Sequence, residues 1–216
     1  QKEKMRKSAI KRMQSKKGAF FTKGKSKQEK ELGKFLKTVV SKIIPSDKEL
    51  LSGLEIDYFL PEHKIAIEYN GGYWHSDVFK EKRYHLKKTK EVEEKGSRLI
   101  HIWDHDWVHK RKVVESIITN ALGKNKERIY ARKTELREIN NKDTTEFLKS
   151  NHLQGSSVSK YRYGLFNNGE LVSVMTFSSL RRATGLEGKE GSYELIRFCN
   201  KINTSVVGGA SKLYNH

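Results

Sequence analysis

The sequence predicts an α/β protein made of two units, and three features indicate this. Segments with apolar residues at helical spacing alternate with segments in which apolar and polar residues alternate, as in layered α/β folds. A polar, basic stretch at residues 124–132 separates two such series and is the predicted linker. The 216 residues and 35% hydrophobic content allow two modest cores. We therefore expect a basic arm at 1–28, a first unit at 29–123 and a second unit at 124–216.

The first unit opens with a capping-box pattern, Ser26 followed by Glu29, which predicts a helix over residues 27–40. Alternating side chains then predict a hairpin of two strands, residues 54–60 and 64–69, joined by a turn at residues 61–64. The remaining elements of this unit are expected to be a helix at 82–94 ended by Gly96, a short buried strand at 98–103 and a further helix capped by Asp104 or Asp106.

The second unit has similar signals. Asp143 and Glu146 form a capping pattern before a helix that contains Phe147 and Leu148. Two alternating runs, 161–166 and 170–177, flank Asn168-Gly169 and predict a hairpin with a tight turn. A strand at 193–199 and a glycine turn at 206–212 that opens a helix complete the expected elements.

The charge distribution indicates a polyanionic partner. The formal net charge is +18, and residues 1–28 hold eleven Lys or Arg against one Glu. Such an arm is typical of segments that contact phosphates, so the expected partner is nucleic acid, and the family resemblance given below implies double-stranded DNA. A solvated solubility element and a contact with anionic lipid are the alternatives. The candidate DNA contacts in the arm are Lys7, Lys11, Arg12, Lys16, Lys17, Lys23 and Lys25.

Other features exclude whole classes of site. No run approaches the ~20 apolar residues of a membrane span, and no signal-peptide core is present, so we expect a soluble intracellular protein. Cys199 is the only cysteine, which excludes an intrachain disulfide and a multi-cysteine zinc site. Because the chain opens with Gln1 and stops at His216 inside a predicted helix, we expect a fragment of a longer protein.

The first hairpin carries the most informative pattern. A tight turn centred on Glu62-His63 places Asp57 opposite Glu68, with Cβ atoms roughly 4.5–5.5 Å apart. Two carboxylates at that distance repel each other unless a cation neutralises them. Magnesium, with manganese as the alternative, uses one or two carboxylates together with water and substrate phosphate. The pair therefore predicts a metal site, although two solvent-facing residues of an amphipathic hairpin would give the same pattern.

Several motifs in order carry a family resemblance. Residues 26–36, Glu55 to Phe59, Ile67 to Gly71, Tyr73-Trp74-His75 and 96–103 resemble the very-short-patch-repair (Vsr-like) nickases and their phage homing-endonuclease relatives. The likeness extends over about residues 26–107. It implies the PD-(D/E)xK nuclease fold with magnesium, in which Asp57 binds the metal, Glu29 supports it and His75 moves a proton.

The sequence departs from this family at three positions. Asn70 stands where the wider superfamily has a lysine two residues after the strand carboxylate. At the position of Glu68, the repair nickases have a residue other than a carboxylate. His85 stands where the repair nickases have an acidic partner for the histidine that corresponds to His75, so His85 is a second candidate for proton transfer. Lys88, one helical turn later, could neutralise phosphate charge. The resemblance also implies that aromatic side chains wedge between base pairs. The candidates are Tyr73 and Trp74, for which a core position is the alternative.

Residues from about 128 to 216 resemble the N-terminal half of acetyltransferase-like (GNAT) folds, including phage DNA-modification proteins of the Mom type. In that family the glycine turn binds the pyrophosphate of acetyl coenzyme A. A DNA-binding or spacer domain that kept the fold is the alternative. Its candidate DNA contacts are Asn151, His152, Gln154, Arg181 and Arg182.

Two further motifs are interpreted as structural. The histidines and aspartates of residues 101–107 suit a strand followed by a capped helix, and Cys199 suits a buried position in an apolar strand. The leading functional hypothesis is a magnesium-dependent, site-specific DNA endonuclease or nickase of phage or mobile-element origin, acting in the host cytoplasm. The alternatives are a DNA-modifying acyltransferase and a DNA-binding protein without catalysis.

Overall fold

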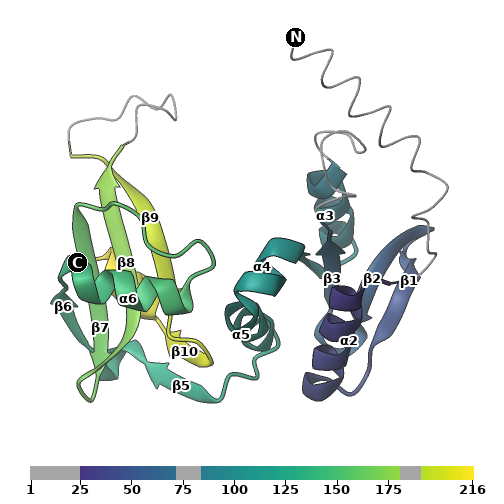
Figure 1. Cartoon of the computed structure of the whole chain (residues 1–216), viewed down its shortest axis with the longest axis horizontal. Helices are drawn as coiled ribbons and strands as arrows, with labels where there is room; N and C mark the ends of the chain where they lie inside the picture. The colour runs from purple at the N-terminus through teal and green to yellow at the C-terminus, as the bar shows by residue number, and fades with distance from the viewer. Residues whose placement is uncertain (1–24, 72–83, 181–190) are drawn as a thin grey trace, which may run out of the picture.

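A computed structural model describes residues 25–71, 84–180 and 191–216 (Figure 1). The described residues form six α-helices and ten strands, with the strands in three sheets, which confirms the α/β class. None of these helices is long and apolar enough to cross a membrane. The hydrophobic clusters fall into an N-terminal unit and a C-terminal unit, with residues 123–126 between them.

The N-terminal unit contains a four-stranded sheet in the order β1-β2-β3-β4. Strands β1, β2 and β3 are antiparallel, while β4 is parallel to β3 and lies at the sheet edge. The elements are α2 (Lys27–Val39), β1 (Ile44–Leu51), β2 (Leu54–Leu60), β3 (Ile65–Asn70), α3 (Tyr84–Glu94), β4 (Arg98–Trp103), α4 (Asp104–His109) and α5 (Arg111–Ala121).

Both faces of this sheet are covered because each face carries apolar residues. On one face Ile67 and Ile100 join the cluster that includes Leu36 of α2 and Ile118 of α5. On the other face Ala66 and Leu99 join the cluster that includes Val92 of α3. All six residues of β3 are buried, as expected of a strand covered on both sides. Side chains of β3 that face α3 therefore lie in a largely dry environment.

Most predicted elements of this unit are confirmed, one strand was not predicted, and one expectation is wrong. Strand β1 has no alternating pattern, with only two of its eight residues buried, and was not expected. The N-cap of α4 is Trp103, and Asp104 and Asp106 lie in its first turn instead. Gly96 ends α3 with a φ of +71°, in the left-handed region that glycine adopts readily.

The C-terminal unit pairs a four-stranded antiparallel sheet with helices on both faces. The sheet order is β6-β7-β8-β9, and a separate parallel pair joins β5 to β10. Helix α6 covers the face that carries Val174, and α7 packs on the face that carries Leu165 and Met175. The elements are β5 (Glu127–Tyr130), β6 (Glu135–Glu138), α6 (Asn141–Asn151), β7 (Tyr161–Asn167), β8 (Glu170–Ser179), β9 (Tyr193–Asn200), β10 (Thr204–Val207) and α7 (Gly209–Tyr214).

Here too the structure corrects two expectations. Residues 127–130 are not part of a linker, because they form β5 and pair with β10. The N-cap of α6 is Asn140, whose side chain accepts a hydrogen bond from the Asp143 amide. The predicted hairpin is confirmed: β7 and β8 are joined by Asn168 and Gly169, both with positive φ, as a two-residue type I′ turn requires.

A polar seam joins the two units along α5. The Asn203 amide donates to Ser116 Oγ at 2.7 Å, and Ser205 Oγ donates to Asn120 Oδ1 at 2.8 Å. Asn125 bridges the same region by donating to Ser205 Oγ at 2.9 Å. Leu153, which follows α6, packs against the core of the N-terminal unit. Figure 1 shows α4 and α5 on the side of the N-terminal unit that faces the C-terminal unit.

We expect Ser116→Ala to weaken this seam. Ser116 is buried, and its loss leaves the Asn203 amide without its acceptor, which should lower the free energy of unfolding by about 1–3 kcal/mol. Urea unfolding measures the change. Ser150→Ala, which removes an exposed hydroxyl bonded only within α6, is the control and should stay within about 0.5 kcal/mol of wild type. Equal effects of the two changes would show that the seam contributes nothing.

Candidate active site

The first hairpin has the register that the sequence predicts. Tyr58 pairs with Ile67 and Leu60 with Ile65, so one step further Asp57 stands opposite Glu68. By strand alternation both lie on the side of Phe59 and Ala66, which face α3. The strand pairing ends at Tyr58, and beyond it Asp57 Oδ2 accepts a hydrogen bond from the Tyr69 amide at 2.7 Å. This contact fixes the Asp57 carboxylate at the point where the two strands separate.

Glu68 forms a buried ion pair with Lys88 of α3. The Lys88 ammonium lies 2.7 Å from Glu68 Oε2, and the two side chains are 3% and 8% exposed respectively. Lys88 also donates to the Glu55 carbonyl at 2.6 Å. Glu68 is therefore not a solvent-facing residue of an amphipathic hairpin. The cation that contacts this strand carboxylate therefore comes from α3.

Helix α2 brings Glu29 to the same region. Its N-terminus is fixed by Ser26, whose hydroxyl accepts from the Glu29 amide at 3.1 Å. The Tyr58 hydroxyl donates to the Glu29 carbonyl at 2.8 Å, and it packs where a side chain at Gly33 would clash. Lys25 lies 3.1 Å from the Glu29 carboxylate and donates to the Asp57 carbonyl at 3.0 Å. These contacts link α2 to β2 at Asp57.

The carboxyl groups of Asp57 and Glu29 have pKa values above their usual range. Burial raises the pKa of Asp57, although the Tyr69 amide and the charges of Lys25 and Lys88 oppose the rise. Burial and the charge of Asp57 raise the pKa of Glu29, and Lys25 opposes this rise. Burial, together with Glu29 and Asp57, raises the pKa of Tyr58 to about 12. Lys25 and Lys88 supply two positive charges beside three carboxyl groups, those of Glu29, Asp57 and Glu68, so full ionisation leaves the group one positive charge short.

A divalent cation would supply that charge, and the donor set fits a hard cation. Magnesium is commonly held by one or two carboxylates together with water and substrate phosphate, and Asp57 and Glu68 provide two. No group of three or more His, Cys, Asp or Glu suited to a metal occurs within residues 25–71, 84–180 and 191–216. The described residues thus offer two carboxylates across one hairpin, and one of them, Glu68, is buried and already paired with Lys88, so the expected opening to a phosphodiester is not seen at Glu68.

The proton-transfer candidates are only partly visible. His75, Tyr73 and Trp74 lie outside the described residues. The ring of His85 packs edge-on against His101 and Trp103, with centroids 5.3 and 5.2 Å apart. His85 therefore sits on the α3 side of the sheet, next to β4. His85 therefore lies on the same face of the sheet as Glu68, because Glu68 of β3 stands opposite His101 of β4.

The remaining site predictions have mixed outcomes. Of the arm, only Lys25 is described, and its ammonium is directed at Glu29 and the Asp57 carbonyl. The other arm candidates, with Arg181 and Arg182, lie outside the described residues. Asn151 is used inside the fold, because its side chain bonds to the Phe147 carbonyl and the Ile202 amide. The candidates outside the description are Lys7, Lys11, Arg12, Lys16, Lys17 and Lys23.

The features interpreted as structural keep that interpretation. Asp104 accepts from the Tyr69 hydroxyl, and burial raises the pKa of the Cys199 thiol to about 12, which disfavours a thiolate. At the glycine turn, a side chain at Gly209 would meet Val206 at 2.9 Å, so close packing explains the glycine. Lys212 donates to the carbonyls of Ala131 and Thr134 and so joins α7 to residues 131–134.

The sequence did not predict the carboxylate contacts of two lysines. Lys25 was assigned to DNA, and Lys88 was assigned to phosphate, whereas both contact carboxylates of the site. A usable signal existed for Lys88, because it stands four residues before Val92, and these two are the buried residues of α3. For Lys25 we find no such signal, since its position depends on how α2 packs on β2.

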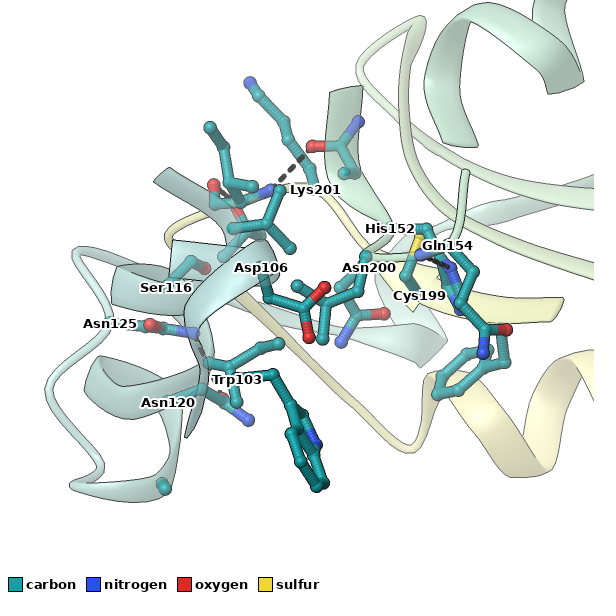
Figure 2. Close-up of a pocket in the computed structure, with 18 of the residues that line it drawn as sticks. Trp103, Asp106, Ser116, Asn120, Asn125, His152, Gln154, Cys199, Asn200 and Lys201 are labelled. Atoms are coloured by element: carbon teal, nitrogen blue, oxygen red, sulfur yellow. Dashed lines mark hydrogen bonds between the residues drawn. The ribbon is translucent and has the colours of Figure 1, made fainter. Parts of the chain in front are cut away.

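A second feature is a cleft of about 650 Å³ between the two units (Figure 2). It runs beside the exposed edge of β4 and is lined by α4, α5, the segment after α6 and the end of β9. Trp103 and His101 of β4 line it from the N-terminal unit, and Gln154 and Asn200 from the C-terminal unit. Because Glu68 pairs with His101, the cleft lies next to the carboxylate site.

Comparison with known proteins gives no relative for this chain. No family model, curated protein or solved structure matches it.

We expect Lys88→Met to destabilise the fold strongly. The change leaves the Glu68 carboxylate buried without its cation, which should cost about 3–5 kcal/mol. The double variant Glu68→Gln/Lys88→Met should lose less than the single variant, because it buries no charge. Lys87→Met, at an exposed neighbour on the same helix, should change the free energy of unfolding by less than about 0.5 kcal/mol. Additive losses in the double variant would contradict a coupled pair.

The raised pKa of Asp57 predicts a pH-dependent effect of Asp57→Asn. An unfolded Asp ionises near pH 4, so over the range above this the folded chain binds more protons and loses stability as the pH rises. Asparagine removes this loss and can still accept from the Tyr69 amide. We therefore expect the variant to gain stability relative to wild type as the pH rises from about 4 to 7. Urea unfolding across that range tests this, and a pH-independent difference would contradict it.

Proposed function

We propose that this chain is a magnesium-dependent DNA endonuclease and that its N-terminal unit has the PD-(D/E)xK fold. The observation that carries the proposal is the grouping of Asp57, Glu68 and Lys88 at the end of one hairpin. Two strand carboxylates and a lysine are the residue types that the family resemblance calls for. The lysine comes from α3, which compensates for Asn70 at the strand position.

The surroundings support a phosphodiester substrate. A net charge of +18 attracts nucleic acid, and the arm would contact phosphates in a sequence-independent way. His101 of the edge strand β4 lines the interunit cleft and pairs with Glu68, so the cleft lies one strand away from Glu68 and two strands away from Asp57. We propose double-stranded DNA as the substrate, and magnesium or manganese as the cofactor.

In this proposal Asp57 and Glu68 hold the metal, which would polarise the scissile phosphate and acidify a bound water. Glu29 and Lys25 set the charge beside Asp57 from α2. Lys88 orients the Glu68 carboxylate through its contact with Oε2. His75, or His85 from α3, accepts or donates the proton, and the product carries a 5′-phosphate by analogy with the resembled family.

A plasmid-nicking assay tests the proposal. Wild type should relax supercoiled DNA with magnesium and not with EDTA, and Asp57→Asn should reduce the rate by at least about 10³-fold, because it weakens a metal ligand worth several kcal/mol in the transition state. Glu62→Gln is the matched control. It neutralises an exposed carboxylate in the turn of the same hairpin and should leave the rate within about twofold of wild type.

The outcomes separate the hypotheses. Equal nicking by wild type and Asp57→Asn would overturn the proposal. Gel-shift binding of DNA by both proteins without magnesium-dependent cleavage would favour a DNA-binding protein without catalysis. Because Asp57→Asn should fold at least as well as wild type, unfolding cannot explain a loss of nicking.

A further inference from the structure

The interunit cleft has the size of a ligand site. Its volume of about 650 Å³ lies within the ~300–1,000 Å³ typical of small-molecule sites, and such sites often lie where two units meet. Figure 2 shows Asp106 and Asn200 in the middle of the cleft, with Trp103 on one side and Gln154 on another. These four residues come from both units, so the cleft exists only when the units are joined.

Several amides of the cleft are already used by the fold. Asn120 and Asn125 belong to the seam, and Asn151 bonds to main-chain groups. Three of the other polar side chains that line the cleft are candidates to bind a ligand. Asn200 Oδ1 is buried and has no hydrogen-bond partner among the described residues. The Asp106 carboxylate, 25% exposed, has only a 3.7 Å contact with His105 in the described chain, and Gln154 is exposed. A buried acceptor without a partner indicates a missing ligand or water.

Trp103 provides an aromatic surface on one side of the cleft. Trp103 is 42% exposed although it ends a buried strand, and its indole borders the cleft. An exposed indole beside carboxylate and amide groups suits a flat, polar ring, because the ring can stack while its edge forms hydrogen bonds. Nucleobases have this combination. A carboxylate accepts from an exocyclic amino group, as Asp and Glu do with cytosine in DNA readers.

The position of the cleft relates it to the carboxylate site. In the parallel pair Glu68 faces His101 and Asn70 faces Trp103. With strands about 4.8 Å apart and two residues spanning about 6.6 Å, Trp103 lies within about 10 Å of Glu68 along the sheet. That separation is one or two nucleotides of a DNA strand. A base held at Trp103 would therefore place a neighbouring phosphate one or two nucleotides along on the side of Glu68, with Asp57 one strand further away.

We propose that the cleft binds a single unpaired nucleobase that carries an exocyclic amino group. Asp106 accepts from the amino group, Asn200 and Gln154 bond to the adjoining ring atoms, and Trp103 stacks on the ring. The placement of this base beside a scissile phosphate rests on the proposed function, whereas base binding itself does not. The base can belong to a DNA strand or to a free nucleotide.

Calorimetry without divalent metal tests the binding. We expect dCMP to bind at least about tenfold more tightly than dTMP, because thymine offers no amino group to Asp106. Asp106→Asn should remove this preference, since an amide can donate as well as accept. Trp103→Ala should weaken dCMP and dTMP binding equally. The control Glu146→Gln, at an exposed residue of α6, should change neither affinity. Equal affinities for dCMP and dTMP in wild type would overturn the proposal.

Two further measurements identify the source and separate this proposal from the endonuclease. A duplex oligonucleotide with one unpaired cytosine should bind more tightly than the fully paired duplex, and Asp106→Asn should abolish the difference. If dCMP binds and the duplexes do not differ, the cleft is a nucleotide site. The Asp57→Asn variant should keep its dCMP affinity even where nicking fails. Loss of the preference for dCMP in that variant would overturn an independent base site.

Discussion

The buried ion pair between Glu68 and Lys88 is the interaction on which the N-terminal unit depends. Two charges within a dry strand and helix are tolerated only where the geometry is close and the remaining hydrogen bonds are made. Here the pair is 2.7 Å apart, and the ammonium also binds the Glu55 carbonyl. The pair therefore fixes α3 against the central strand. It also sets the charge felt by Asp57, whose pKa would rise further without the lysine.

The elements that the sequence predicts well are those whose signals are local. The α2 capping box, the Asn168-Gly169 turn and the glycine that ends α3 each lie within a few residues of what they determine, and all three are confirmed. The hairpin register follows from its short turn for the same reason. Strand β5 escaped prediction because its partner, β10, lies about 77 residues later, and a polar four-residue strand has no pattern of its own. Strand β1 was missed because most of its side chains face solvent.

The candidate site divides in the same way. Asp57, Glu68 and Glu29 were found from register and resemblance, since each lies within or beside a recognisable motif. What depends on tertiary packing was not found: Lys88 reaching Glu68, Lys25 bridging Glu29 and the Asp57 carbonyl, and the cleft between the units. A pattern based on polarity predicts that a lysine on a helix faces solvent. This prediction can be wrong because the long side chain can bury its stem and still bring the ammonium to a distant acceptor.

The candidate site residues are divided between the two units, which affects how sequence changes in one unit would act. The described carboxylates of the candidate active site all precede residue 70. Gln154 and Asn200 follow residue 150 and line the cleft from the C-terminal unit. If both proposals hold, sequence drift in the segment after α6 would alter the contacts of Gln154 and Asn200 with the base, whereas Asp57 and Glu68, and also Asp106, lie in the N-terminal unit and would stay unchanged. An exchanged C-terminal unit would then change the contacts around the base and not the choice of an amino group, provided that the seam residues on α5 are matched.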